Sequence, residues 1–117
     1  MGRVEKRERE RIDLALPVEY FRIDSDARLI GGLHRGYTVN VSQNGFMVHS
    51  RDEIPTDSDV RIKLFFSFPD LRWVETLSQV IWIAKGEKGS DYLSGIGIVR
   101  IVQDLRTWEQ FWDNLFR

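Results

Sequence analysis

Apolar and polar residues alternate along much of the chain, which is the pattern of half-buried β-strands. The clearest segment covers residues 60–66, where apolar side chains occupy every second position. Turn signals separate such segments, notably Asn44-Gly45, in which both residues tolerate a positive φ. A polar loop is expected over residues 24–32. Six strands are predicted. The first begins within residues 16–20 and the third begins at residues 46–48, while the others cover residues 34–42, 60–66, 73–83 and 93–101.

The alternation ends near Asp104, where apolar residues begin to recur at spacings of three and four. This is one face of an amphipathic helix, formed by Leu105, Trp108, Trp112 and Leu115. Two caps are open: Asp104 itself, or a capping box from Thr107 to Gln110, which would delay the helix to Trp108. The pattern predicts an all-β fold, a six-stranded antiparallel β-barrel with a C-terminal α-helix that closes an open end or packs outside.

The first 13 residues differ from the rest because nearly all of them are charged. They have no apolar face to bury, so residues 1–13 are expected to form a flexible arm. Residues 14–117 then form the barrel, with its helix from about residue 104. At 117 residues, 42% of them hydrophobic, the chain has room for one packed core and not for two ordinary domains.

Charge and cysteine content exclude several classes of function. The formal net charge is -1, which argues against a nucleic-acid-binding surface, because that needs a basic face. The absence of cysteine excludes a disulfide framework, a zinc finger and a thiol nucleophile. No apolar stretch approaches the roughly 20 residues of a membrane helix, and the charged N-terminus has no signal-peptide core. A cytoplasmic protein without membrane insertion is expected.

The arm carries a run of arginines directly before the first predicted strand. Arg7 and Arg11 form an R-x-x-x-R pair, with Arg9 between them. A planar guanidinium binds phosphate oxygens or guanine edges through paired hydrogen bonds and also stacks on rings, whereas lysine does only part of this. Glutamates interleave with these arginines, so the alternative interpretation is an ordinary solvated segment.

A second motif, N-x-S-x-x-G, runs from Asn40 to Gly45 at the end of the second predicted strand. Residues two apart on a strand share a face, so the amide of Asn40 and the hydroxyl of Ser42 are expected side by side, with Val41 facing the core. Gly45 permits a tight turn and the close approach of a ligand. The alternative interpretation is an ordinary hairpin turn whose polar side chains are satisfied.

The order and spacing of these two motifs resemble those of the PilZ domain, a bacterial receptor module for the second messenger cyclic-di-GMP. Residues 80–82 and 95–98 also look like the later strands of that family, so the resemblance covers nearly the whole chain. It implies the PilZ barrel fold, binding of cyclic-di-GMP, and no catalysis, metal or cofactor. The family motif has Asp or Asn at the position of Asn40, and the amide lacks the charge that would hold guanine most firmly.

The resemblance also implies roles for individual residues. Arg7 and Arg11 would contact phosphates and stack on guanines, while the barrel-side wall would consist of Asn40, Ser42 and Gly45. Arg9 and Trp82 are further candidates, the latter as a stacking platform, although packing of Trp82 in the core or on the helix is the alternative.

Three functions remain to be compared. In the first, the ligand orders the arm and thereby signals to a separate, unidentified effector protein, since no output module is expected. The second is a protein-interaction adaptor of the same fold that does not bind the nucleotide. The third is a small barrel that binds single-stranded nucleic acid, which the charge balance disfavours. His34 and His49 are isolated and expected to be structural, and Trp73, Trp108 and Trp112 are expected to pack inside.

Overall fold

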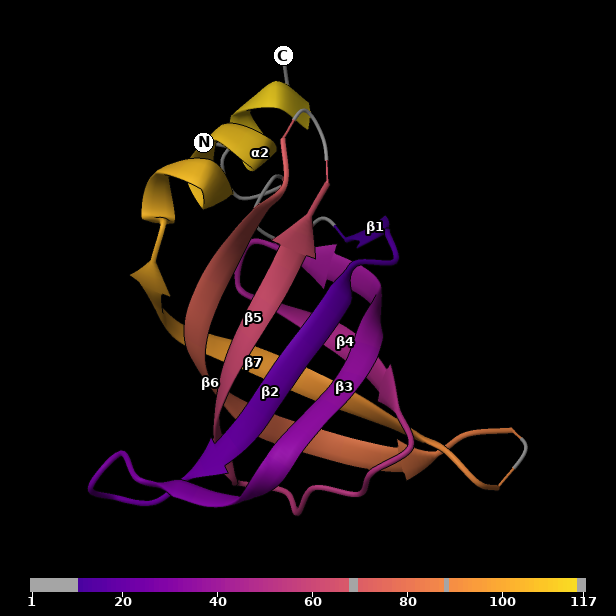
Figure 1. Cartoon of the computed structure of the whole chain (residues 1–117). Coiled ribbons are helices and arrows are strands. Elements are labelled where there is room, and N and C mark those ends of the chain that lie inside the picture. Colours follow the sequence, from indigo (N-terminus) through magenta and orange to yellow (C-terminus); the bar gives the residue numbers. More distant parts are fainter. Residues whose placement is uncertain (1–10, 68–69, 88, 116–117) are drawn as a thin grey trace, which may run out of the picture.

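The strands of this chain wind into a closed antiparallel β-barrel with a helix at one end (Figure 1). The computed structural model describes residues 11–67, 70–87 and 89–115. The elements are β1 (Ile12–Asp13), β2 (Pro17–Ile23), β3 (Leu29–Ser42), β4 (Gly45–Ser50), β5 (Asp59–Phe66), β6 (Arg72–Lys85), β7 (Tyr92–Gln103) and α2 (Leu105–Leu115).

Closure of the barrel depends on β3, which has partners on both edges. The strand order is β1-β3-β2-β5-β6-β7-β4, and β4 returns to pair with β3. All of these pairings are antiparallel. The predicted fold, a six-stranded antiparallel barrel with a C-terminal helix, is therefore confirmed, with the two-residue β1 added to it. Closure pairs the strand edges that an open sheet would expose.

The strands extend further than the sequence pattern indicates. β3 begins at Leu29, so the loop before it covers residues 24–28 and not 24–32. At the N-terminal side, Ile12 and Asp13 fall within the predicted arm, but they pair with Val41 and Asn40 of β3. Ile12 also packs against the core. This contact explains why strand pairing includes two residues that were assigned to the arm because the segment is highly charged.

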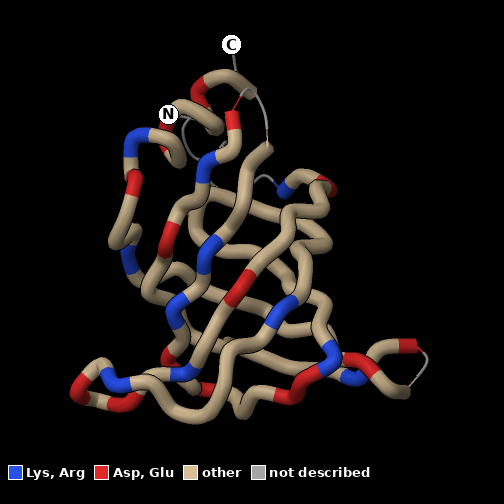
Figure 2. Tube along the Cα trace, viewed as in Figure 1, with Lys and Arg blue, Asp and Glu red and all other residues tan. Residues whose placement is uncertain are grey.

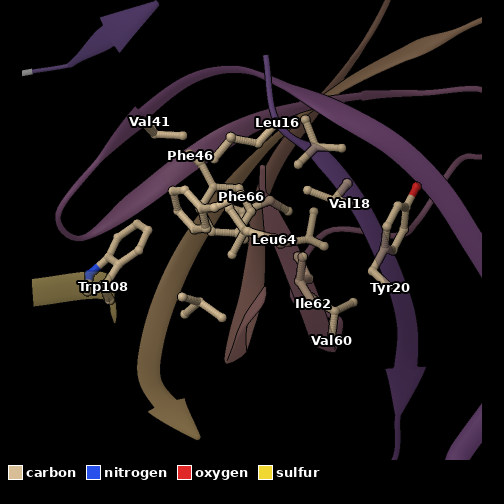
Figure 3. Packing of buried hydrophobic residues seen from close by; sticks show 14 of the residues in the cluster. Leu16, Val18, Tyr20, Val41, Phe46, Val60, Ile62, Leu64, Phe66 and Trp108 are labelled. Atoms are coloured by element: carbon tan, nitrogen blue, oxygen red, sulfur yellow. The ribbon is translucent and has the colours of Figure 1, made fainter. Parts of the chain in front are cut away.

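The core fills the barrel interior and follows the alternation seen in the sequence. Val60, Ile62 and Leu64 of β5 are at most 1% exposed, while the residues between them face outward. Figure 3 shows these side chains converging with residues from other strands and with Trp108 of the helix. Burial of each such aliphatic side chain stabilises the fold by about 1.5–3 kcal/mol.

α2 lies over one end of the barrel (Figure 1). Its aromatic side chains pack against the core there. Trp108 and Trp112 are buried, as predicted. The ring centroid of Phe111 lies 5.1 Å from that of Phe66 at the end of β5. The helix thus closes an end of the barrel, the first of the two positions that the sequence left open.

Asp104 caps α2 and fixes its start at Leu105. Its carboxylate accepts hydrogen bonds from the backbone N–H and the hydroxyl of Thr107, at 3.1 and 2.7 Å. These bonds hold the pKa of the Asp104 carboxyl below its usual range. The buried face of the helix is narrower than its periodicity suggests, because Leu105 and Leu115 are 52% and 46% exposed.

The sequence predicts interior packing for Trp73, but this residue lies on the outer face of β6 and is 40% exposed. Its neighbour Val74 is fully buried, and successive strand residues face opposite sides. Outside the barrel, the ammonium of Lys63 lies 5.6 Å from the indole centroid, a cation–π geometry.

Candidate functional site

The two sequence motifs meet at one point on the barrel surface. The Arg11 guanidinium donates a hydrogen bond from Nη1 to Oδ1 of Asn40, at 3.0 Å and across 29 residues of sequence. Strand β1 brings this contact about, because Asp13 pairs with Asn40 and Ile12 pairs with Val41. The end of the predicted arm is thereby attached beside the N-x-S-x-x-G motif. Arg7 and Arg9 lie outside the described residues.

A β-bulge sets the position of Asn40. On β3, Thr38 pairs with Val48 of β4 and Asn40 pairs with Met47, so Val39 is the extra residue. Such a bulge re-aims the side chains that follow it. Asn40 is half-buried, and its Nδ2 lies 4.0 Å from the sulfur of Met47. The amide is thus positioned from both sides, by Arg11 and by Met47.

Ser42 and Gly45 serve the β3–β4 hairpin in this structure. The buried Ser42 hydroxyl donates to the carbonyl oxygen of Gly45 at 3.0 Å. A Cβ on Gly45 would lie 2.2 Å from the backbone oxygen of Ile96 on β7, so strand packing alone requires glycine there. The turn residues are Gln43 and Asn44. A hairpin turn is therefore present as predicted, but it lies one residue before Asn44-Gly45, and neither of these two residues has a positive φ.

Four residues of neighbouring strands share one row of the barrel wall. Asn40 pairs with Met47, Met47 with Gly95 of β7, and Gly95 with Trp82 of β6. With strands about 4.8 Å apart, the row spans roughly 14 Å from Asn40 to Trp82. Trp82 is 41% exposed, so it packs neither in the core nor against the helix, and its indole remains a candidate stacking surface.

The sequence pattern does not predict this row, because a second bulge is needed to form it. The register of β6 against β7 shifts between Val80 and Trp82, which leaves Ile81 and Trp82 both exposed. A Cβ on Gly95 would lie 2.1 Å from Nε1 of Trp82, so glycine makes room for the indole. The nearest signal in the sequence is Gly95, which lies opposite Trp82, whereas Gly97 lies opposite Gln79.

A ring nitrogen of each histidine contacts an aspartate side chain, in agreement with a structural role. Nδ1 of His34 lies 2.8 Å from Oδ2 of Asp52, and Nε2 of His49 contacts Asp91. Within residues 11–67, 70–87 and 89–115, no group of three or more metal-ligating side chains is found. No helix in the same residues is long and apolar enough to cross a membrane. Acidic residues lie among the basic ones along the described strands (Figure 2).

Comparison with known proteins identifies the fold. The PilZ domain family model matches residues 5–113. The inhibitor of motility of Bacillus subtilis (MotI/DgrA) superposes with a TM-score of 0.71 at 18% identity, over 91% of this chain and 49% of that one. The PilZ domain of CeSA from a cellulose-synthesizing bacterium superposes with a TM-score of 0.56 at 16% identity, over 92% of this chain and 99% of that one.

This chain therefore spans about half the length of MotI/DgrA and the same length as the CeSA domain. At such identities the likeness shows the fold alone. No curated protein matches the sequence at a significant level.

Proposed function

The chain belongs to the PilZ domain family, whose members are non-catalytic receptor domains, and on this premise we propose that it is a receptor for cyclic-di-GMP. The observation that carries the proposal is the hydrogen bond between Arg11 and Asn40. It joins an arginine of the arm to the N-x-S-x-x-G motif, so a ligand bound at either motif would also touch the other. A receptor for this messenger would act in the bacterial cytoplasm.

Each candidate residue has a role that suits its chemistry. Arg7 and Arg11 bind the phosphates and stack on the guanines, with Arg9 as an auxiliary cation. On the barrel side, Asn40 contacts a guanine edge, and Ser42 and Gly45 form the wall next to it. Trp82, in the same row as Asn40, offers a face for the second purine.

Ligand binding would replace the hydrogen bond between Arg11 and Asn40 with a contact between Arg11 and a phosphate. In this structure the guanidinium of Arg11 is bonded to Asn40, and its side chain is on the surface. A cyclic dinucleotide carries two negative charges, which attract Arg11 more strongly than a neutral amide does. Phosphate contacts would hold Arg7 and Arg11 together and order the arm against the barrel. The ordered arm would then create or hide a surface for a separate effector protein.

Isothermal titration calorimetry tests the proposal, with GTP and single-stranded DNA as controls. Cyclic-di-GMP should bind in the micromolar range, about -8 kcal/mol, and the controls should not. At about 100 times the dissociation constant the ligand should stabilise the fold by about 2.7 kcal/mol. For a chain of this size the melting temperature should then rise by roughly 10 °C.

A protein-interaction adaptor that does not bind the nucleotide is the second candidate. It is favoured by the partners that the motif already has, because Ser42 is buried and bonded to Gly45, and Asn40 is bonded to Arg11. The same titration separates the two functions. Absence of heat and of a melting shift at millimolar cyclic-di-GMP would contradict the receptor and support the adaptor.

A further inference from the structure

β3 is longer than β4, and the difference leaves part of one β3 edge without a backbone partner. β4 pairs with β3 only as far as Gly36, opposite Ser50. On the other edge, β2 pairs with β3 down to Leu29. In the part of the chain that the structure describes, no strand pairs with residues 29–35 on the β4 side. An unpaired edge of this kind is a template for a strand from another chain.

A groove of about 730 Å³ opens where β4 leaves this edge. It is lined by residues 33–37 of β3 and by residues 49–52 at and after the end of β4. Among the lining residues, the rings of Tyr37 and His49 are stacked, with centroids 4.9 Å apart. The lining therefore combines the unpaired part of β3 with an aromatic pair.

Apolar or aromatic side chains alternate with a basic one along the outer face of this edge. Leu33, Arg35 and Tyr37 share the outer face of β3, and Leu33 and Tyr37 are 54% and 47% exposed. Arg35 binds Glu19 through Nε, at 3.2 Å, which leaves its terminal nitrogens for a second carboxylate. Arg51, across the groove, is exposed and forms no ion pair with any described residue.

We propose that the groove is a docking site for an extended segment of a partner protein, in which apolar and acidic side chains alternate along one face, at every second residue. The segment adds to β3 as a strand, and the backbone of residues 33–35, beyond the bulge at Gly31, supplies main-chain hydrogen bonds to it. Its apolar side chains pack beside Leu33 and Tyr37, and its carboxylates lie between Arg35 and Arg51. A second copy of this chain fits less well, because it would bring two further arginines into the groove.

This site is separate from the proposed nucleotide site. Tyr37, the lining residue nearest to Asn40, lies three positions before it on the same strand, which corresponds to about 10 Å, and His34 lies about 20 Å away. Docking at the groove therefore requires no bound nucleotide, and its failure would leave the cyclic-di-GMP proposal unaffected.

The test uses the capped, fluorescein-labelled heptapeptide Thr-Val-Thr-Glu-Thr-Val-Thr, titrated with the full chain by fluorescence anisotropy. Its valines and glutamate share one face, as Leu33, Tyr37 and Arg35 do on β3. Two control peptides carry lysine in place of glutamate, or proline in place of the first valine. The glutamate peptide should bind saturably, and both controls should bind at least about tenfold more weakly. Amide hydrogen exchange should slow at residues 33–35 when the glutamate peptide is added.

A charge-reversed chain, Arg35→Glu with Arg51→Glu, provides the matched protein control. Both side chains are on the surface, so the fold should be retained. This variant should prefer the lysine peptide and still bind cyclic-di-GMP as the parent chain does. No saturable binding of the glutamate peptide at millimolar concentration, or an unchanged peptide preference after charge reversal, would overturn the proposal. So would protection of residues 33–35 by dimer formation without peptide, which would assign the edge to a second copy.

Discussion

The indole of Trp82 lies in the space that a side chain at Gly95 would fill. A Cβ at residue 95 would be 2.1 Å from Nε1 of Trp82, a distance that no real contact tolerates. Because Gly95 also pairs with Met47, whose other neighbour in the row is Asn40, the glycine lets the indole turn toward the proposed nucleotide site. A residue with no side chain thus determines where the stacking surface lies.

We predict that Gly95→Ala lowers the affinity for cyclic-di-GMP several-fold while changing the free energy of unfolding by less than about 1 kcal/mol. The added methyl displaces an exposed ring and not the backbone, so the fold can absorb it. Gly97→Ala is the matched control, since its Cβ would meet only the side chain of Ile81, with Cδ1 at 3.1 Å and Cγ1 at 3.3 Å. Calorimetry and urea unfolding give the two quantities. Equal affinities for the two variants would exclude Trp82 from the site.

Gly45→Ala should act through stability first. Its Cβ would lie 2.2 Å from the backbone oxygen of Ile96, and a backbone atom cannot move aside without shifting β7. We expect a loss of about 1–3 kcal/mol in the free energy of unfolding. The control is Gly32→Ala, where nothing lies within 4 Å of the added carbon, and the change should stay within about 0.5 kcal/mol. If Gly45→Ala unfolds at the same urea concentration as the parent, glycine is needed there for the ligand and not for packing.

Much of the barrel could be predicted because period-two alternation is local and specific. On β5, Val60 to Leu64 identify both the strand and its buried face. The start of the helix was narrowed to two caps, of which the structure uses Asp104. The positions of the β-bulges could not be predicted in this way. The extra residue on β6 exposes Trp82 next to Ile81, and no alternation pattern reports which residue of a strand its partner will skip.

The arrangement of the candidate site could be read from the sequence only in part, and for a similar reason. The motifs place Arg11 and Asn40 near each other only by resemblance, since 29 residues separate them and β1 had no apolar alternation to reveal it. Neither Met47 nor Gly95 belongs to the two motifs recognised in the sequence. Their place beside Asn40 depends on registers between strands, which are set by the packing of the whole barrel.

The Asp104 cap predicts a specific acid dependence of stability. Hydrogen bonds from Thr107 lower the folded-state pKa of this carboxyl below its ordinary value of 3.8. The stabilisation that the ionised Asp104 carboxyl contributes is therefore fully present above its unfolded-state pKa, and it is lost as the pH falls through its folded-state pKa. Asp104→Asn keeps an acceptor at the cap and tolerates the positive φ of 61° found there.

Urea midpoints measured between pH 6 and pH 2.5 should then fall less steeply below about pH 4 for Asp104→Asn than for the parent. Parallel curves for the two proteins would show that other carboxyl groups account for the acid sensitivity of this fold.

Arg7→Ala and Arg11→Ala should each weaken cyclic-di-GMP binding by at least about tenfold, because each removes charge-assisted hydrogen bonds to a phosphate. The melting temperature without ligand should hardly change for Arg11→Ala, since its bond to Asn40 is exposed. Arg9→Ala is the control and should have a smaller effect on affinity. A larger loss of affinity for Arg9→Ala than for either Arg7→Ala or Arg11→Ala would show that Arg9 faces the ligand and that the assigned register of the arm is wrong.

The arm should gain more protection from hydrogen exchange on ligand binding than any other segment. Two bound phosphates give Arg7 and Arg11 strong anionic partners, and the order of residues 5–11 then follows from contacts with the ligand. Part of the binding energy is used to order the chain, and affinity should decrease with salt as phosphate contacts are screened. A chain that begins at Ile12 keeps β1 and should fold without binding cyclic-di-GMP. If the amides of residues 5–11 exchange equally fast with and without saturating ligand, the receptor does not signal through its arm, even where calorimetry confirms that it binds.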